Sequence, residues 1–251
     1  MLGICRTHGK SDSRSSSVPL TDISLSLATW GLLAVLGGFL AVDGVSVPQV
    51  MVSRPLISAT LGGLVLGDAA AGMLIGALLE LLSMRHPPYG AAKYPDTGPA
   101  GLIAGAAYAG VGGGSLQGLV AALLVGWSIG WMGAYADYGR RRLNGRLFMS
   151  SEILAEDPRR VERRHRLAIG IDMMRGILLT GGLLLPATLL VALVGMIPIT
   201  STGLAIGATA VVILLASSVG SAARTTAPDV RAWAMVLLGA MIVLTTLWLR
   251  T

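Results

Sequence analysis

The sequence predicts an all-α, polytopic integral membrane protein that contains re-entrant or broken helices. Only 13% of its residues are charged and 53% are hydrophobic, whereas soluble domains average about 25% charged residues. The mean hydropathy of +0.72 also indicates a membrane protein. The 34 glycines favour helices whose backbones approach closely, because small residues allow tight packing in membranes. These observations argue against a soluble globular protein.

The long uncharged stretches define the expected membrane spans, since a spanning helix needs about 20 apolar residues. These stretches are residues 23–42, 116–136 and 233–249, together with 176–223, which divides into two spans at 197–201. Residues 1–22 are polar and are predicted to form a disordered extension. The membrane domain is therefore expected to cover residues 23–251. The first apolar run is longer than the core of a typical signal peptide, which favours a retained helix.

The region 43–96 is different, because its apolar pieces are too short to cross a bilayer. Residues 55–67 would form a helix only about 20 Å long before Asp68, and residues 69–79 form a similar piece before Glu80. This pattern predicts a re-entrant hairpin or a broken helix. Irregular backbone at membrane depth is tolerated only where protein or a water-filled cavity surrounds it, and transporters build substrate sites from such helices.

Nine arginines lie between positions 140 and 166. Retention of basic residues on the cytoplasmic side predicts that residues 137–166 form a cytoplasmic loop and that the basic N-terminus lies on the same side. The alternative is a surface that binds nucleic acid or anionic lipid. No interleaved aromatic residues, zinc-ligand spacing or helix-turn-helix pattern supports nucleic acid, so no nucleic-acid partner is expected.

Charged side chains within the apolar region 43–96, with one polar neighbour, are the candidate site residues, because each ionised group costs about 2.5–3.5 kcal/mol at the bilayer centre. The candidates are Asp43, Gln49, Arg54, Asp68, Glu80 and Asp96. Carboxylates and amides suit sugar hydroxyls, which both donate and accept hydrogen bonds. Purely structural roles compete with this interpretation: Asp68 could cap the next helix, and Asp96 could be a turn residue. Glu80, surrounded by Leu and Ala, has the weakest structural explanation.

Other residues of the sequence indicate a structural ion pair but no catalytic or metal site. Asp172 and Arg175 are three positions apart on an expected helix, which suits a structural ion pair. The chain contains no Walker loop, G-x-S-x-G or H-E-x-x-H motif. Cys5 is the only cysteine, and His86 has no neighbouring His or Cys, so neither a metal nor another cofactor is expected. The chain is therefore not expected to be an enzyme on its own.

The motif-bearing residues resemble a known family. The segments Asp43-Gly44-Val45-Ser46-Val47-Pro48-Gln49 and Ser53-Arg54-Pro55-Leu56 begin the pattern, which continues as T-L-x-G-x-x-L-G-D, G-x-x-I-G-x-x-L-E and P-D up to Asp96. This pattern resembles the IIC membrane subunit of the mannose/fructose/sorbose-type phosphotransferase system (PTS). Outside residues 38–96 the resemblance lies only in length and hydropathy.

The resemblance implies a sugar-translocating subunit of the bacterial inner membrane that acts with a IID membrane subunit, in an oligomeric assembly. Cytoplasmic IIB, charged by IIA at the expense of phosphoenolpyruvate, would phosphorylate the translocated sugar, a hexose of the mannose kind. Of the candidates, Arg54, Asp68, Glu80 and Asp96 match the family motif. Glu80 and Asp96 would accept hydrogen bonds from the sugar, and Asp68 would shape the tip of the broken helix. Asp43 and Gln49 are second choices.

The sequence is also compatible with two other functions. One is a non-transporting membrane subunit that regulates or scaffolds phosphocarrier proteins, and the other is a permease coupled to protons through Glu80. Residues 85–89, the N-terminal extension and the basic 137–166 segment are unusual for the family. The basic segment could dock IIB or hold anionic lipid.

Overall fold

A computed structural model describes residues 26–46, 49–84, 93–112, 115–148, 158–198 and 200–226. Every regular element in these ranges is helical, which confirms the predicted all-α class. Four of the described helices are long and apolar enough to cross a membrane: α1 (Leu27–Val45), α5 (Leu116–Phe148), α7 (Pro158–Met196) and α8 (Ser201–Thr226). The protein is therefore a polytopic membrane protein, as the composition predicted.

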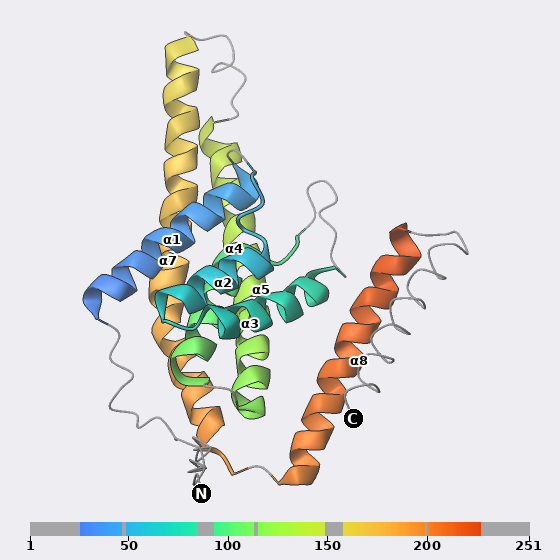
Figure 1. The fold of residues 1–251 in the computed structure, drawn as a ribbon. Coiled ribbons are helices and arrows are strands. Elements are labelled where there is room, and N and C mark those ends of the chain that lie inside the picture. The colour runs from blue at the N-terminus through green and yellow to red at the C-terminus, as the bar shows by residue number, and fades with distance from the viewer. Residues whose placement is uncertain are drawn as a thin grey trace, which may run out of the picture.

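Helices α5 and α7 form the long scaffold, and α1 and α4 pack directly against it (Figure 1). Helix α1 begins at the cap residue Ser26, whose Oγ accepts a hydrogen bond from the Thr29 amide at 3.1 Å. It then crosses α7 in close contact: a Cβ on Gly176 would lie 2.5 Å from the Cβ of Ala41. Small residues at this crossing allow the two backbones to approach.

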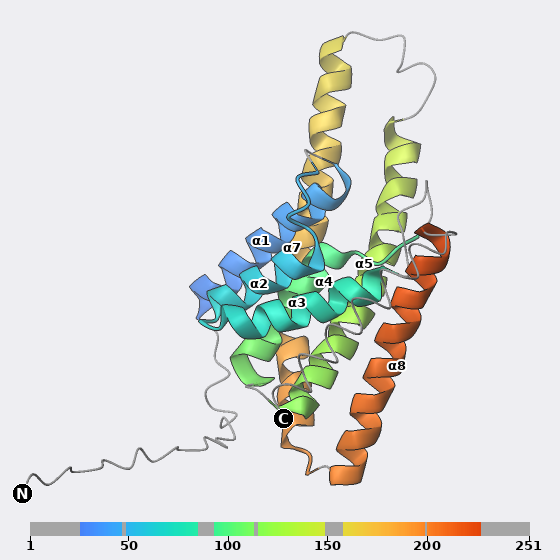
Figure 2. The ribbon, with the colours of Figure 1, turned by 45° about the vertical axis from the view of Figure 1, so that its right-hand side comes forward.

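Two short helices, α2 (Pro55–Val65) and α3 (Ala69–Ser83), form an antiparallel hairpin beside α1 (Figure 2). Gly67, with φ +87°, allows the chain to reverse, because a left-handed backbone is unstrained in glycine. The Asp68 carboxylate then accepts a hydrogen bond from the Ala71 amide at 2.9 Å and caps α3. The broken hairpin predicted from the short apolar pieces is confirmed, and so is the capping role considered for Asp68.

Helix α4 (Thr97–Ala107) continues into the π-helical turn η2 (Tyr108–Gly112) and packs against α2. The contact is very close, because a Cβ on Gly105 would lie only 2.2 Å from the Ala59 carbonyl oxygen. Almost all of α4 is buried. It therefore fills the space between the hairpin and the α5/α7 scaffold.

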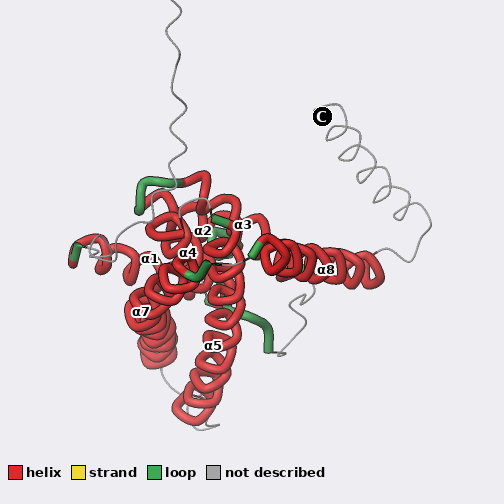
Figure 3. Tube along the Cα trace, turned by 90° about the horizontal axis from the view of Figure 1, so that it is seen from below, coloured by secondary structure: helices red, strands yellow, loops and turns green. Residues whose placement is uncertain are grey.

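Helix α8 stands to one side of the other described helices, as the view from below shows (Figure 3). It contacts α3 and α5. Only 6% of its most apolar window is buried, and Ile206, Val212 and Ile213 are more than 60% exposed. The break at residues 197–201 expected from the sequence is confirmed, since α7 ends at Met196 and α8 begins at Ser201.

The basic segment 137–166 differs from the expected loop, because most of it is helical. Helix α5 continues to Phe148, and α7 already begins at Pro158. Arginine is a good helix former, and proline suits the first position of a helix, so the helices extend through the charged residues. The expected extension 1–22, the span 233–249 and residues 85–89 lie outside the described residues.

Candidate functional site

A cavity of about 810 Å³ lies where α1 and α3 end and the segment before α4 begins. Four of the candidate residues line it: Asp43, Gln49, Arg54 and Asp96. They come from three separate parts of the chain, namely the end of α1, the loop before α2 and the segment before α4. The cavity falls within the size range of small-molecule sites, about 300–1,000 Å³.

Glu80 is held beside this cavity by Arg54. The Arg54 Nη1 donates to Glu80 Oε1 at 2.8 Å, and the Leu56 amide approaches Glu80 Oε2 at 3.4 Å. The Arg54 side chain is 54% exposed and that of Glu80 is 20% exposed. Because an ionised carboxylate offers about four acceptor positions, Glu80 keeps capacity for another donor.

Asp43 organises the loop that forms one wall. Its two carboxylate oxygens accept hydrogen bonds from the Val50 and Ser53 amides, each at 2.8 Å. Within this loop Gln49 and Met51 have φ values of 55° and 66°, a left-handed conformation that is uncommon for residues other than glycine. The buried Asp43 carboxylate therefore holds the loop, and with it Gln49, in a fixed shape.

Asp96 takes part in a buried ion network rather than standing alone. Its Oδ2 accepts from Arg175 Nη1 at 2.5 Å, and the Arg175 Nε donates to Asp172 Oδ1 at 3.0 Å. Both Asp96 and Arg175 side chains are about nine-tenths buried, and Asp172 is fully buried. The Asp172–Arg175 pair predicted from the spacing is confirmed, and Arg175 connects it to the cavity wall.

The network continues into α5 through residues that were expected to lie in a loop. Arg140 pairs with Asp137 at 2.6 Å and with Asp172 at 3.3 Å, and Arg141 pairs with Asp137 at 2.6 Å. Asp137 also lines the cavity. The i,i+3 and i,i+4 spacing of these residues is a helical signal, and it could have placed them on an extension of the 116–136 helix.

Asp68 lies apart from the other candidates. It occupies the turn between α2 and α3, whereas Arg54 and Glu80 lie at the opposite end of this hairpin. At 1.5 Å per residue, the length of α2 separates the two ends by about 16 Å. The structure thus brings five candidates together around the cavity and leaves Asp68 at the hairpin tip.

The cavity wall carries side chains that both donate and accept hydrogen bonds. Within the described residues, no three His, Cys, Asp or Glu side chains are grouped as metal ligands. The site instead combines carboxylates with a guanidinium group and an amide, which supplies acceptors and donors in the same cavity.

Comparisons with known proteins identify the family. Residues 27–214 match the family described as the PTS system sorbose-specific IIC component. The chain belongs to this family. A solved structure described as "Structure of membrane protein" has the same fold as this IIC family member, with a TM-score of 0.69 and 17% identity over 91% of this chain and 97% of that one.

Similar curated proteins match over a short stretch only. The sorbose-specific EIIC component of Klebsiella pneumoniae is 44% identical over 50 residues. The fructose permease IIC component of Bacillus subtilis and the mannose-specific EIIC component of Escherichia coli are each 46% identical over 50 residues. Each alignment covers 20% of this IIC family member and 19% of the relative.

Proposed function

We propose that this chain is the sugar-translocating IIC subunit of a phosphoenolpyruvate-dependent PTS of the mannose/fructose/sorbose type. The observation that carries the proposal is the family match over residues 27–214. It is supported by the cavity, whose polar side chains come from the discontinuous region between α1 and α4. The protein would reside in the bacterial inner membrane, as a member of an oligomeric assembly.

The sugar would bind against Arg54 and Glu80. Arg54 donates and Glu80 accepts hydrogen bonds, so the pair can engage adjacent hydroxyls of a hexose. Asp96 would accept a hydrogen bond from a further hydroxyl through the oxygen lone pairs that Arg175 leaves free, while Gln49 would reach the sugar from the loop held by Asp43. Backbone conformations that cost energy are retained most often at functional sites, and Gln49 has such a conformation.

The chain would act with a IID membrane subunit and with cytoplasmic IIA and IIB. The sugar is phosphorylated on the cytoplasmic side by IIB, so the IIC subunit needs to bind and release sugar but not to carry phosphate. This division of labour fits a cavity lined by carboxylate, amide and guanidinium groups.

The test is uptake of radiolabelled mannose, fructose and sorbose in cells that contain IIA, IIB and IID. We expect Glu80→Gln and Asp96→Asn each to lower uptake at least tenfold, because a carboxylate that binds hydroxyls contributes about 1.5–3 kcal/mol per charged hydrogen bond. Asp68→Asn is the matched control. It makes the same chemical change at the hairpin tip, asparagine still caps a helix, and uptake should stay within twofold.

Full uptake in both cavity variants would overturn the assignment of the site. Uptake that needs a proton gradient, but neither IIB nor phosphoenolpyruvate, would instead indicate a proton-coupled permease. A chain that supports no uptake of any sugar, yet binds phosphocarrier proteins, would indicate a regulatory subunit.

A further inference from the structure

The charged ends of α5 and α7 form a stalk beyond the apolar part of the scaffold. We define this stalk as residues 137–148 of α5 and 158–175 of α7. Figures 1 and 2 show that the two ends project past the other described helices on the same side.

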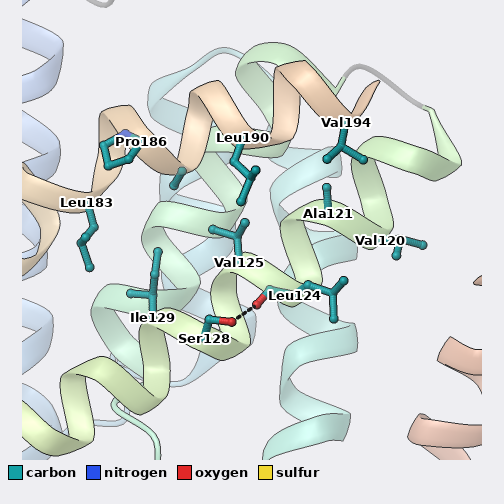
Figure 4. A pocket seen from close by; sticks show the side chains of 11 residues that line it. Val120, Ala121, Leu124, Val125, Ser128, Ile129, Leu183, Pro186, Leu190 and Val194 are labelled. Atoms are coloured by element: carbon teal, nitrogen blue, oxygen red, sulfur yellow. Dashed lines mark hydrogen bonds between the residues drawn. The ribbon is translucent and has the colours of Figure 1, made fainter. Parts of the chain in front are cut away.

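The uncharged parts of the two helices locate the bilayer. Residues 116–136 and 176–196 each measure about 31 Å at 1.5 Å per residue, which matches a hydrocarbon core about 30 Å thick. They lie side by side in opposite directions, because residues of both line one apolar hollow of about 340 Å³ that runs from Val120 and Val194 to Ile129 and Leu183 (Figure 4). Both helices therefore leave the hydrocarbon at one level, near Asp137 and Gly176.

The arginines near the start of α7 lie far from the hydrocarbon core along the helix axis. Measured from Gly176, Arg166 lies about 15 Å, Arg163 about 20 Å and Arg159 about 26 Å along the axis. The headgroup layer on each side is only about 5–8 Å thick, and a tilt of about 20° shortens these heights by less than a tenth. The backbone positions of the three arginines therefore lie beyond the headgroups. By the same measure Arg142 of α5 lies about 9 Å from Ala136, within reach of the headgroups.

The three α7 arginines share one face of the helix. Their spacing of four and three residues places them in a row, and all three are exposed. They line a hollow of about 520 Å³ together with Glu162, Leu167 and Gly170. Glu162 pairs with Arg166, so the face still carries a net positive charge. Guanidinium groups bind carboxylates through two parallel hydrogen bonds, which suits a protein surface rich in Asp and Glu.

We propose that the basic α7 face, formed by Arg159, Arg163 and Arg166, docks a cytoplasmic protein through an acidic surface of that protein. Anionic lipid is the other polyanion available to a membrane protein, and the height of the face argues against it. The proposal rests on the proposed function, because the protein used to test it is the IIB phosphocarrier.

The test compares two variants that remove equal charge from the stalk. Arg159→Gln/Arg163→Gln alters the basic α7 face, and Arg142→Gln/Arg146→Gln alters α5. Each is reconstituted with IID in nanodiscs of phosphatidylcholine, with or without one-third phosphatidylglycerol. Binding of purified IIB is measured by biolayer interferometry at low and high salt. We expect the α7 variant to weaken binding at least tenfold at low salt in both lipids, and the α5 variant to stay within threefold.

Unchanged binding by the α7 variant, equal losses in both variants, or a loss confined to phosphatidylglycerol nanodiscs would overturn the proposal. Sugar uptake by the wild type distinguishes a failure of the docking proposal from a failure of the proposed function. If the wild type supports uptake but does not bind IIB in nanodiscs, the docking face is wrong and the proposed function stands. If it supports neither, the proposed function is wrong and the docking face falls with it.

A second measurement tests the height of the face directly. Fluorophores are attached to Arg163→Cys and, separately, Arg142→Cys in a Cys5→Ser background. We expect aqueous iodide to quench the dye at position 163, while a nitroxide-headgroup lipid quenches the dye at 142 more strongly. Equal lipid quenching at both positions would place the α7 face at the membrane surface and contradict protein docking.

Discussion

Arg54 and Glu80 join the beginning of α2 to the end of α3 through a partly exposed ion pair. Exposed pairs contribute only about 0.2–1 kcal/mol to stability. We therefore predict that Arg54→Gln lowers sugar uptake at least tenfold but shifts the thermal unfolding midpoint of the purified protein by no more than about 4 °C. Uptake in cells and tryptophan fluorescence in detergent measure the two effects. A large loss of stability with proportionate loss of uptake would make Arg54 a structural residue only.

Arg175 is the opposite case, because it is buried between two carboxylates. Removing one member of a buried ion network leaves an uncompensated charge and costs about 3–5 kcal/mol. We predict that Arg175→Ala lowers the thermal midpoint by roughly 10 °C. Arg146→Ala, which removes an exposed arginine of the α5 end, should leave the midpoint unchanged. Similar shifts in both variants would mean that the buried network contributes little.

These residues also show what sequence can predict about a site. The Asp68 cap and the Asp172–Arg175 pair could be predicted, because each interaction joins positions within one helical turn. The bond between Asp96 and Arg175 joins positions 79 apart, and no local pattern indicates it. The sequence could therefore identify Asp96 as a polar residue in an apolar region, but not the arginine that fixes its position.

At the level of helices, the packing of α4 against α2 depends on the absence of a side chain at Gly105. We predict that Gly105→Ala lowers the thermal midpoint, because the new Cβ would lie 2.2 Å from the backbone oxygen of Ala59 and the helices would have to separate. Gly139→Ala is the control, since nothing lies within 4 Å of a Cβ there. Alanine favours a helix over glycine by up to about 1 kcal/mol, so this control should raise the midpoint or leave it unchanged.

The same helices mark how far apolar length alone can predict the fold. The hairpin of α2 and α3 followed from pieces too short to span a bilayer, and the break before α8 followed from the Ile-Pro-Ile-Thr-Ser sequence. The ends of α5 and α7 did not follow, because a dense run of arginines is also typical of a cytoplasmic loop. Arginine clusters indicate the side of the membrane but do not end a helix, which needs glycine, proline or a cap.

For the whole molecule, the two ends of the scaffold should face opposite sides of the membrane. The positive-inside rule predicts that the stalk lies in the cytoplasm, and the chain between α7 and α8 lies at the far end of α7. We predict that Thr200→Cys, in a Cys5→Ser background, reacts with a membrane-impermeant maleimide in intact spheroplasts. Val161→Cys, on the stalk, should react only after lysis. Both substituted positions are exposed, so access rather than burial decides the result.

The native Cys5 provides an independent check of the same orientation. Helix α1 ends at the level of the stalk, where the Ser46 Oγ donates a hydrogen bond to Asp172 Oδ2, and its start lies away from the stalk (Figure 1). If α1 spans the membrane, it begins on the side opposite the stalk, which argues against the cytoplasmic N-terminus expected from its basic residues. Unsubstituted protein should therefore be labelled at Cys5 in intact spheroplasts, like Thr200→Cys. The reverse pattern, with Val161→Cys labelled in intact spheroplasts, would put the arginines outside. A cytoplasmic protein could then not reach the basic α7 face. The labelling of Val161→Cys therefore tests both the topology and the docking proposal.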